Sequence, residues 1–208
     1  MEVPSSSTAQ RRLAREHVRE DPEAALRLAE RLSASEDWRE RSLACFVYGW
    51  LGASNPGVAF SALRKLASDE DWRVREAVAT ALTEISRLER EAYLAEVSEW
   101  VRDADPRVRR AAVESLRVLA RRQPHVVLGI LEEVKSEEDE YAANAVSHIL
   151  REMTKADPAL VKSLCLKWAS EGRRATARIV RRGMKKLPAR DQEEILSVLG
   201  ERLAQGRG

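Results

Sequence analysis

The sequence has few of the residues that disulfides, metal sites and nucleophilic catalysis require. It contains two cysteines and three histidines in 208 residues. Cys45 and Cys165 fall in distant parts of the chain at positions typical of an apolar core, so we expect no disulfide framework and a reducing compartment. The HExxH, CxxC, GxGxxG, GxSxG and phosphate-loop motifs do not occur. We therefore predict no metal and no cofactor.

Long apolar runs are also missing. No stretch approaches the 18 residues of a membrane span, and the opening MEVPSSSTAQRR lacks the apolar segment of a signal peptide. We therefore expect a cytoplasmic protein with no membrane partner. Aromatic residues make up 5% and charged residues 34% of the chain, which suits a long helical protein with much surface. The net charge of +2 does not by itself indicate nucleic acid.

The sequence does contain an internal repeat. Segments such as DWRERSLACFVY and DWRVREAVATAL recur at intervals of 34 residues, and their starts are Asp37, Asp71, Asp105, Asp139 and Arg173. A second series with the same spacing, or twice that spacing, consists of prolines that follow a capping residue: Pro22, Pro56, Pro124 and Pro158. A cap followed by proline is how a helix begins. Each unit is therefore predicted to hold two helices.

The two helices of a unit differ in length and composition. The first, helix A, is expected to begin at the proline and to run for about ten residues, and helix B for roughly fifteen residues from the aspartate. In the second unit Val74, Ala77, Val78, Ala81, Leu82 and Ile85 share one face at the helical period. No stretch alternates at period two, so we expect no sheet. Stacked pairs bury these faces in an all-α, right-handed α-α superhelix, a solenoid of about five pairs.

The repeat also predicts the organisation of the chain as one elongated domain. Residues 1–20 are expected to be a partly disordered N-terminal capping segment, and residues 191–208 a C-terminal capping helix with a loose GRG tail. The five repeats between them, over 21–190, are 21–54, 55–88, 89–122, 123–156 and 157–190. The period and the D-x-x-V-R-x-x-A pattern resemble HEAT repeats, a repeat type that serves many functions.

Positive charge gathers on one face of the B helices. Positions 2, 5, 9 and 12 after each start lie within about 80° of one another at 100° per residue. Together they carry nine basic and two acidic side chains. We call this set the basic strip; besides Ser42, Phe46, Gly49, Glu76, Thr80, Thr83, Glu114 and Ala175 it contains Arg39, Arg73, Arg107, Arg110, Arg117, Tyr141, Asn144, His148, Arg151, Arg178, Arg182 and Lys185. Helix B generally lines the concave side of such solenoids, where a phosphate backbone could bind.

Two less specific interpretations remain open for these charges. Runs of charge are usually solvated helix faces. Arginine at position 4 of helix B, as in Arg41, Arg75 and Arg109, commonly ties neighbouring repeats together through the aspartates. The segment RRATARIVRRGMKK, with seven basic residues and no acid, is the strongest part of the strip. Clustered charge of one sign favours a polyanion as the partner.

Several segments together resemble one family. DWRVREAVATALTEI, DPRVRRAAVESLRVLARR and EYAANAVSHILREMTKADPALV, in this order and spacing, resemble the HEAT-like-repeat DNA alkylation repair proteins, the AlkC and AlkD families. The resemblance covers residues 35–187. It implies a DNA glycosylase scaffold that holds duplex DNA in a concave groove through backbone contacts and releases alkylated purines. We expect the protein to be a monomer.

The resemblance also implies the residues of the site. In these families an aromatic residue and a carboxylate one turn apart begin a B helix, and here this pair matches Trp72 and Glu76. An N-alkylated purine is already cationic, so a carboxylate that stabilises the oxocarbenium-like sugar is the main requirement. Glu152 is the candidate for a second acid. Candidate DNA contacts are Arg73, Arg107, Arg110, Arg117, Tyr141, His148, Arg151, Arg178, Arg182 and Lys185.

The sequence departs from the family at identifiable positions. His148 stands where one family has a further tryptophan, and VRRAAVESLR lacks the tryptophan that the other has in the third unit. Trp72 repeats the phase of Trp38, which also fits packing between units, and Glu76 could be an ion-pair partner of Arg110. Trp100 and Trp168 share a core phase and are expected to pack.

We therefore predict a DNA-binding HEAT-like-repeat protein of the alkylation repair type, with excision of cationic alkylated purines as the implied activity. The main alternative is a non-catalytic scaffold that binds an acidic protein partner or non-canonical DNA structures. A pigment-lyase-like HEAT module is a weaker alternative, because the B helices offer no nucleophile on this face.

Overall fold

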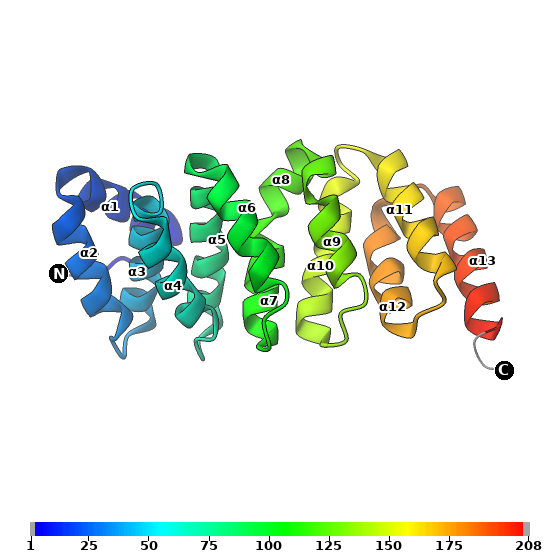
Figure 1. The fold of residues 1–208 in the computed structure, drawn as a ribbon, viewed down its shortest axis with the longest axis horizontal. Helices are drawn as coiled ribbons and strands as arrows, with labels where there is room; N and C mark the ends of the chain where they lie inside the picture. Colours follow the sequence, from blue (N-terminus) through cyan, green and yellow to red (C-terminus); the bar gives the residue numbers. More distant parts are fainter. Residues whose placement is uncertain (1–2, 206–208) are drawn as a thin grey trace. The chain divides into compact units, whose positions relative to one another are not determined.

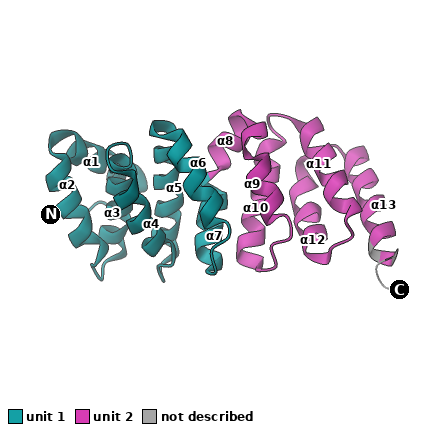
Figure 2. Cartoon of the chain, in the orientation of Figure 1, with its two compact units in different colours: residues 1–115 teal, residues 116–208 magenta. Residues whose placement is uncertain are grey.

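The computed structural model describes residues 3–205, and every regular element among these residues is a helix. The chain divides into two compact units, Met1–Ser115 and Leu116–Gly208, and the boundary lies inside the repeat predicted for 89–122 (Figure 2). No helix among the described residues is long and apolar enough to cross a membrane. The predicted GRG tail, residues 206–208, lies outside the described part of the chain.

Unit 1 consists of helix pairs preceded by one extra helix, as Figure 1 traces in chain order. The predicted capping segment contains this extra helix, in which Gln10 and Ala14 are buried. The A helices of unit 1 are α2, α4 and α6, and the B helices are α3, α5 and α7. The elements are α1 (Ser7–Glu20), α2 (Pro22–Ser33), α3 (Trp38–Leu51), α4 (Pro56–Ala67), α5 (Trp72–Leu88), α6 (Arg90–Trp100) and α7 (Pro106–Ser115).

Unit 2 continues the alternation with shorter elements at its start. A one-turn 3-10 helix, η1, precedes α9, and a second one, η2, follows α12. Its B helices are α10 and α12, and α13 packs against α11 in the position of a closing A helix. The elements are α8 (Arg117–Arg122), η1 (Pro124–Val127), α9 (Leu128–Val134), α10 (Glu140–Met153), α11 (Pro158–Ser170), α12 (Arg174–Gly183), η2 (Met184–Lys186) and α13 (Ala189–Gln205).

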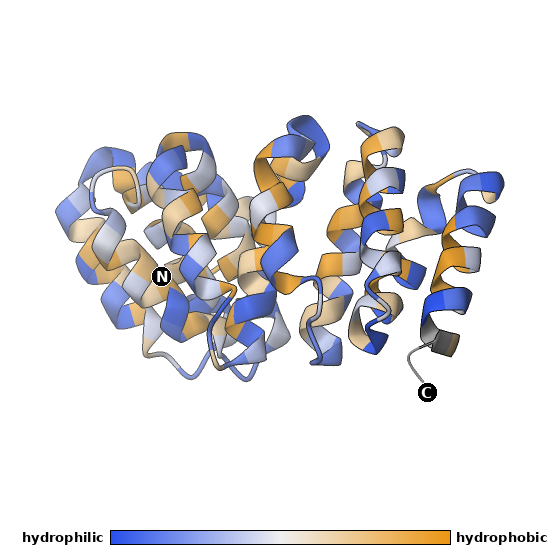
Figure 3. Ribbon diagram, turned by 45° about the vertical axis from the view of Figure 1, so that its right-hand side comes forward, coloured by the Kyte–Doolittle hydropathy of each residue, from blue (hydrophilic) through white to orange (hydrophobic). Residues whose placement is uncertain are grey.

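The helices begin where the capping residues predict. The Asp37 and Asp71 side chains accept hydrogen bonds from the backbone N–H two residues later, at 2.9 and 2.8 Å. Proline occupies the first turn of α2, α4 and α11, where its missing N–H has no partner to lose. In α5 the predicted apolar face is buried. Figure 3 shows the resulting bands of apolar and polar residues along the helices.

The third B helix is interrupted at one residue, Leu116. Helix α7 ends at Ser115 after 10 residues and α8 begins at Arg117, so the roughly fifteen residues expected are helical apart from this break. The Thr83 hydroxyl donates to the Ser115 carbonyl at 3.2 Å, and the Tyr93 and Ser115 hydroxyls lie 2.7 Å apart. A side chain that takes a carbonyl from the helical ladder interrupts the helix. Both partners are distant in sequence, so the repeat pattern alone could not reveal this end.

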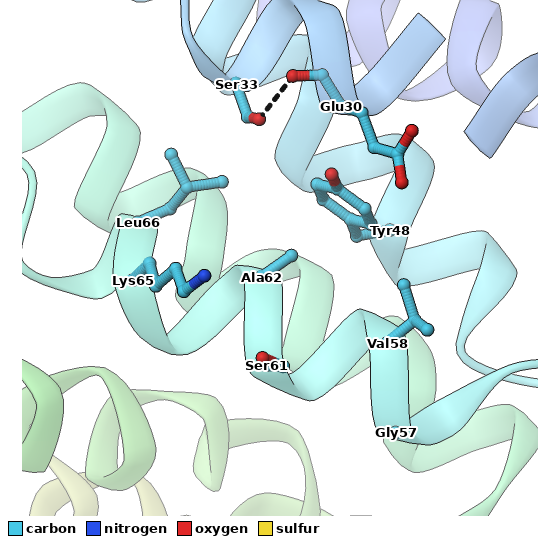
Figure 4. A pocket seen from close by; sticks show the side chains of 9 residues that line it. All are labelled: Glu30, Ser33, Tyr48, Gly57, Val58, Ser61, Ala62, Lys65 and Leu66. Carbon is cyan, nitrogen blue, oxygen red and sulfur yellow. Dashed lines mark hydrogen bonds between the residues drawn. The ribbon is translucent and has the colours of Figure 1, made fainter. Parts of the chain in front are cut away.

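Small residues let the B helices of unit 1 approach closely. A Cβ atom on Gly49 would lie 3.0 Å from the Ala81 Cα, and one on Gly52 would lie 2.6 Å from the Ile85 Cγ1. The A helices diverge instead, and a groove of about 510 Å³ opens between α2 and α4 (Figure 4). The groove is a consequence of close packing in one layer of helices and wider spacing in the other.

The arginines at position 4 of α3, α5 and α7 have structural roles, and Arg41 ties two repeats together as the less specific interpretation predicted. The Arg41 guanidinium of the first repeat binds both carboxylate oxygens of Asp69 in the next repeat, at 2.7 and 2.9 Å. Asp69 also accepts the backbone N–H of the cap Asp71 at 2.8 Å. Arg75 and Arg109 donate to carbonyls in the loops before their own helices. Position 4 of the B helices is therefore structural.

Unit 2 contains a buried indole that an acid holds in place. Trp168 is 0% exposed, and its Nε1 donates to Glu132 at 2.8 Å. Partial burial would raise the pKa of Glu132, but hydrogen bonds from Lys167, Trp168 and Lys135 outweigh it and lower the pKa to about 2. Trp100 in unit 1 is also fully buried. The prediction that these two tryptophans pack in the core is confirmed.

Candidate nucleic-acid interface

Helix α1 covers the first part of the predicted basic strip. Ser42 and Phe46 of α3 are each 2% exposed. The Gln10 amide donates to the Arg39 carbonyl at 3.3 Å, and Arg15 lies over the Trp50 ring at 5.2 Å. Arg11 of α1 forms an ion pair with Glu84 of α5. The expectation that these positions of the first repeat are open is therefore wrong, because α1 packs on them.

The last position of the strip also differs from the expectation. Gly49 packs against Ala81, and Thr83 bonds to the Ser115 carbonyl. Both residues occupy position 12 of their helices and face the next B helix. At 100° per residue this position lies at the edge of the strip nearest position 8, which faces the neighbouring helix. In α5 and α7 the strip is open at positions 2 and 5, where Arg73, Glu76 and Arg107 are exposed and Arg110 is half-buried.

The predicted catalytic pair lines a pocket in unit 1. The pocket has a volume of about 300 Å³ and lies between the N-terminal segment, α3 and α5. The N-terminal segment here means residues 5–10, which include the first turn of α1. Trp72 and Glu76 of α5 both belong to its wall, so the structure brings the two residues together. The lining residues are Ser5, Ser7, Gln10, Trp38, Ser42, Phe46, Trp72, Arg73, Glu76, Ala77 and Thr80.

Trp72 and Trp38 have the same phase in successive repeats but different surroundings. Trp72 is 61% exposed, which is unusual for a large apolar side chain. Trp72 therefore does not have the packing role that its repeated phase suggested. The Arg73 guanidinium lies 3.9 Å from the centroid of the Trp38 ring and 6.0 Å from that of Trp72. A planar cation thus already stacks on one aromatic wall of the pocket.

Arg73 is itself held by the cap of its helix. Its Nε and one terminal nitrogen bind the two carboxylate oxygens of Asp71, at 2.9 and 2.6 Å. This pairing lowers the pKa of Asp71. The same aspartate therefore caps α5 and orients the cation at the pocket.

Glu76 is an accessible carboxylate with one cationic neighbour. Its side chain is 52% exposed, and Arg110 of α7 approaches it at 3.2 Å. Arg110 also lies 3.6 Å from Glu114 on its own helix. The ion pair expected as the less specific role of Glu76 is therefore present, and it coexists with a place in the pocket wall. Arg107, the other predicted contact on α7, is exposed and donates to the Ser68 carbonyl at 3.1 Å.

The predicted contacts in unit 2 lie on α8, α10, α12 and η2. Arg178 donates to the Glu137 and Glu138 carbonyls, and Arg182 binds Asn144 and Glu140 at 2.6 and 2.8 Å. Arg151 donates to the Arg182 carbonyl. Hydrogen bonds thus fix the orientation of these three arginines. Of the remaining residues, Tyr141 and His148 are half-buried, and Arg117 and Lys185 are exposed.

Glu152, the candidate second acid, is part of an ion-pair network in unit 2. It is 7% exposed and lies 2.9 Å from Arg121, 2.5 Å from Lys155 and 3.9 Å from His148. Burial would raise the pKa of Glu152, but Lys155 and its other cationic neighbours lower it. A carboxylate with this many partners is an anchor for side chains and is poorly placed to gain a new charge partner.

Sequence reasoning missed part of the pocket. Gln10, Ser42 and the N-terminal serines line it, although only Ser42 had been placed on the strip. Trp38 could have been predicted as a pocket residue, because it has the phase of Trp72 one unit earlier. The pocket residues before residue 20 could not, because this segment has no counterpart in the repeats.

Comparison with solved structures shows which fold the chain shares. AlkD2 from Streptococcus mutans matches with a TM-score of 0.79 at 24% identity, over 90% of this chain and 93% of that chain. Smu.31 from Streptococcus mutans UA159 matches with a TM-score of 0.69 at 23% identity, over 88% and 99% of the two chains. At such identities the likeness establishes the fold, which is the predicted HEAT-like-repeat solenoid.

A third structure and two family models are similar to this chain. Alkylpurine DNA glycosylase AlkC from Pseudomonas fluorescens matches with a TM-score of 0.71 at 18% identity, over 90% of this chain but 55% of that chain. Residues 25–117 match the model for HEAT repeats, and residues 88–187 match the model for DNA alkylation repair enzymes. No curated protein matches closely enough to count as a relative. Residues 88–187 are thus similar to the DNA alkylation repair enzymes, and the chain shares the HEAT-like-repeat solenoid fold of these structures.

Proposed function

We propose that the protein binds duplex DNA and releases cationic alkylated purines from it as a DNA glycosylase. The observation that carries the proposal is the pocket of unit 1, where exposed Trp72 and the accessible carboxylate of Glu76 form one wall. The match of residues 88–187 to the DNA alkylation repair enzymes supports it. A further support is the similar fold of AlkC, which is described as an alkylpurine DNA glycosylase bound to DNA with an abasic-site analogue.

The chemistry requires few groups from the protein. A purine alkylated at N3 or N7 carries a positive charge and leaves without a strong general acid. As the glycosidic bond breaks, charge develops on the sugar, and the Glu76 carboxylate stabilises it and orients the attacking water. Trp72 offers an aromatic face that attracts a cation. Arg110, at 3.2 Å, holds the Glu76 carboxylate in place.

In this proposal the cations near the pocket and on unit 2 bind backbone phosphates. Hydrogen bonds to carbonyls or acids already orient several of them, which reduces the entropy lost on binding. Such contacts supply affinity without sequence preference, as a repair enzyme needs. The proposed phosphate contacts are Arg73, Arg107, Arg110, Arg117, Arg151, Arg178, Arg182 and Lys185, with Tyr141 and His148 beside them. We assign Glu152 no chemical step, because its carboxylate is already engaged.

Substitution of Glu76 by glutamine tests the catalytic assignment. We expect E76Q to bind duplex DNA as the parent does and to release methylated purine about 10²-fold more slowly, because a preorganised charge is lost. The measurement is base release from methylated duplex DNA in single-turnover conditions. E114Q is the matched control, because Glu114 also approaches Arg110 but does not line the pocket. Equal rates for E76Q and the parent would remove Glu76 as the catalytic carboxylate.

A non-catalytic binding protein is the second candidate. The observation that favours it is the ion pair between Glu76 and Arg110, which already compensates the carboxylate charge. Such a protein would bind DNA of non-canonical structure or an acidic protein through the same cations. DNA binding by the parent without any release of methylated purine would select this candidate.

A further inference from the structure

The first two repeats have the same three residues, an aspartate cap, a tryptophan and an arginine, where their B helices begin, at 37–39 and 71–73. The Arg73 guanidinium of the second repeat lies 3.9 Å from the centroid of the Trp38 ring in the first repeat, which is van der Waals distance. Arg39, the neighbour of Trp38 in sequence, lies 5.9 Å from the same centroid. Of these two cations, the one from the next repeat thus makes the closer contact.

The following junction between repeats is built differently. Arg107 of the third repeat occupies the position that corresponds to Arg73, and its guanidinium donates to the Ser68 carbonyl at 3.1 Å. Trp72, the counterpart of Trp38, is 61% exposed. Repeat packing alone therefore does not require Arg73 to stack on Trp38.

Arg73 is held on a second side by Asp71. Its Nε and Nη2 atoms donate to the two carboxylate oxygens at 2.9 and 2.6 Å. This pairing raises the pKa of Arg73 and lowers the pKa of Asp71, so both groups stay ionised. A guanidinium has five N–H donors, and Asp71 leaves the two on Nη1 unused. The Arg73 side chain is 41% exposed, so an anion can approach it.

We propose that Trp38 is a positioning residue, which holds Arg73 in the orientation that binds one backbone phosphate of duplex DNA. The inference rests on the proposed function and adds to it how this phosphate contact is preorganised. Asp71 fixes one edge of the guanidinium and the Trp38 ring covers one face, so the side chain loses little freedom when a phosphate binds Nη1. Arg73 precedes Glu76 by three residues on α5, so the two side chains are neighbours on the helix surface. The bound phosphate therefore belongs to the DNA segment that Glu76 faces.

A role in packing α3 against α5 is the simpler interpretation of Trp38. The residue is half-buried and lines the pocket of unit 1, so its loss also disturbs packing. The two roles differ in one measurable respect. A packing residue affects DNA affinity whichever residue stands at position 73, whereas a positioning residue acts only through the Arg73 guanidinium. A double-mutant cycle measures this coupling directly.

The test measures the affinity of the full-length parent, W38L, R73A and W38L/R73A for a short DNA duplex by fluorescence anisotropy at several salt concentrations. We expect W38L to weaken binding about threefold, which corresponds to the loss of a partly exposed cation–π contact. R73A should lower the slope of log affinity against log salt by about one, and W38L should lower it too, although it removes no charge. In the R73A background W38L should cause no further loss of affinity. W38F, which keeps an aromatic face, should restore most of the affinity.

R73K examines the same coupling without a change of the tryptophan. Lysine keeps the charge but lacks the planar group, so we expect R73K to bind DNA about threefold more weakly than the parent does. This substitution tests the proposal even if thermal unfolding shows that W38L does not fold.

W50L is the matched control, because Trp50 also lies on α3 and has Arg15 over its ring at 5.2 Å. Neither residue is a proposed DNA contact, so W50L should bind with the affinity and the salt slope of the parent. An equal loss from W38L with and without Arg73, an unchanged slope for R73A, or parental affinity of R73K would overturn the inference. Base release that depends on Glu76 would stand in each of these cases, whereas no binding of DNA by the parent would overturn the proposed function as well.

Discussion

Residues of one type have opposite roles in this chain, depending on what packs against them. Trp100 and Trp168 are 0% exposed, whereas Trp72 is 61% exposed at the mouth of a pocket. The cysteines show the same dependence on surroundings. Cys45 and Cys165 are buried and free, and burial raises the pKa of the Cys165 thiol to about 12. Their expected place in the core is confirmed, and neither thiol is available as a nucleophile at neutral pH.

The acids differ in the same way. Glu76 has one cationic neighbour and is accessible, whereas Glu132 and Glu152 are held by several donors. The sequence could not separate these acids, because several of the donors that hold them come from distant positions. What separates them is the number of donors that the fold brings to each carboxylate, and that depends on residues up to 36 positions away.

At this scale Glu132 has a measurable effect on stability. Its lowered pKa means that the ionised form stabilises the folded state above the ordinary pKa of 4.5, and that this contribution is lost as the pH falls toward 2. We expect E132Q to lower the free energy of unfolding at pH 7 by about 2 kcal/mol, with water screening included. Urea unfolding between pH 7 and pH 3 should show this difference shrink on acidification. E133Q, at the exposed neighbour, is the control; a difference independent of pH would contradict the assignment.

At the scale of the elements, the B helices α3 and α5 of unit 1 approach each other closely, and α1 packs on α3. Capping residues and prolines predicted where most helices begin. The same patterns could not predict that α1 packs on α3, because the segment has no repeat counterpart whose contacts could be copied. They also could not predict the end of α7, because Thr83 and Tyr93 act on it from other helices.

The close approach of α3 and α5 predicts unequal effects of the same glycine substitution. A Cβ atom on Gly49 would meet backbone atoms of Ala81 at 3.0–3.2 Å, whereas one on Gly200 of α13 would meet nothing within 4 Å. We expect G49A to destabilise the protein by about 1 kcal/mol, because crowding outweighs the gain in helix propensity. G200A should stabilise it by about 0.5–1 kcal/mol. Thermal unfolding of both variants checks this, and stabilisation by G49A would refute the close packing.

On the scale of the whole chain, the 34-residue period was enough to predict the fold. It predicts helix pairs, and the comparisons confirm the HEAT-like-repeat solenoid. The candidate site was predictable in part. Trp72 and Glu76 followed from the resemblance, but the pocket that joins them to Ser42 and the N-terminal segment depends on a helix outside the repeats.

The affinity for a short DNA duplex at several salt concentrations tests the central claim most directly. We expect the affinity to fall steeply with salt, because several phosphate contacts release counterions. The variant R107A/R110A/R178A should bind more weakly, and the slope of log affinity against log salt should fall by about one for each arginine that no longer binds a phosphate. The variant R12A/R27A/R102A, which removes the same charge from positions outside the basic strip, should behave as the parent does. No binding at low salt, or the same slope for both variants, would contradict the account.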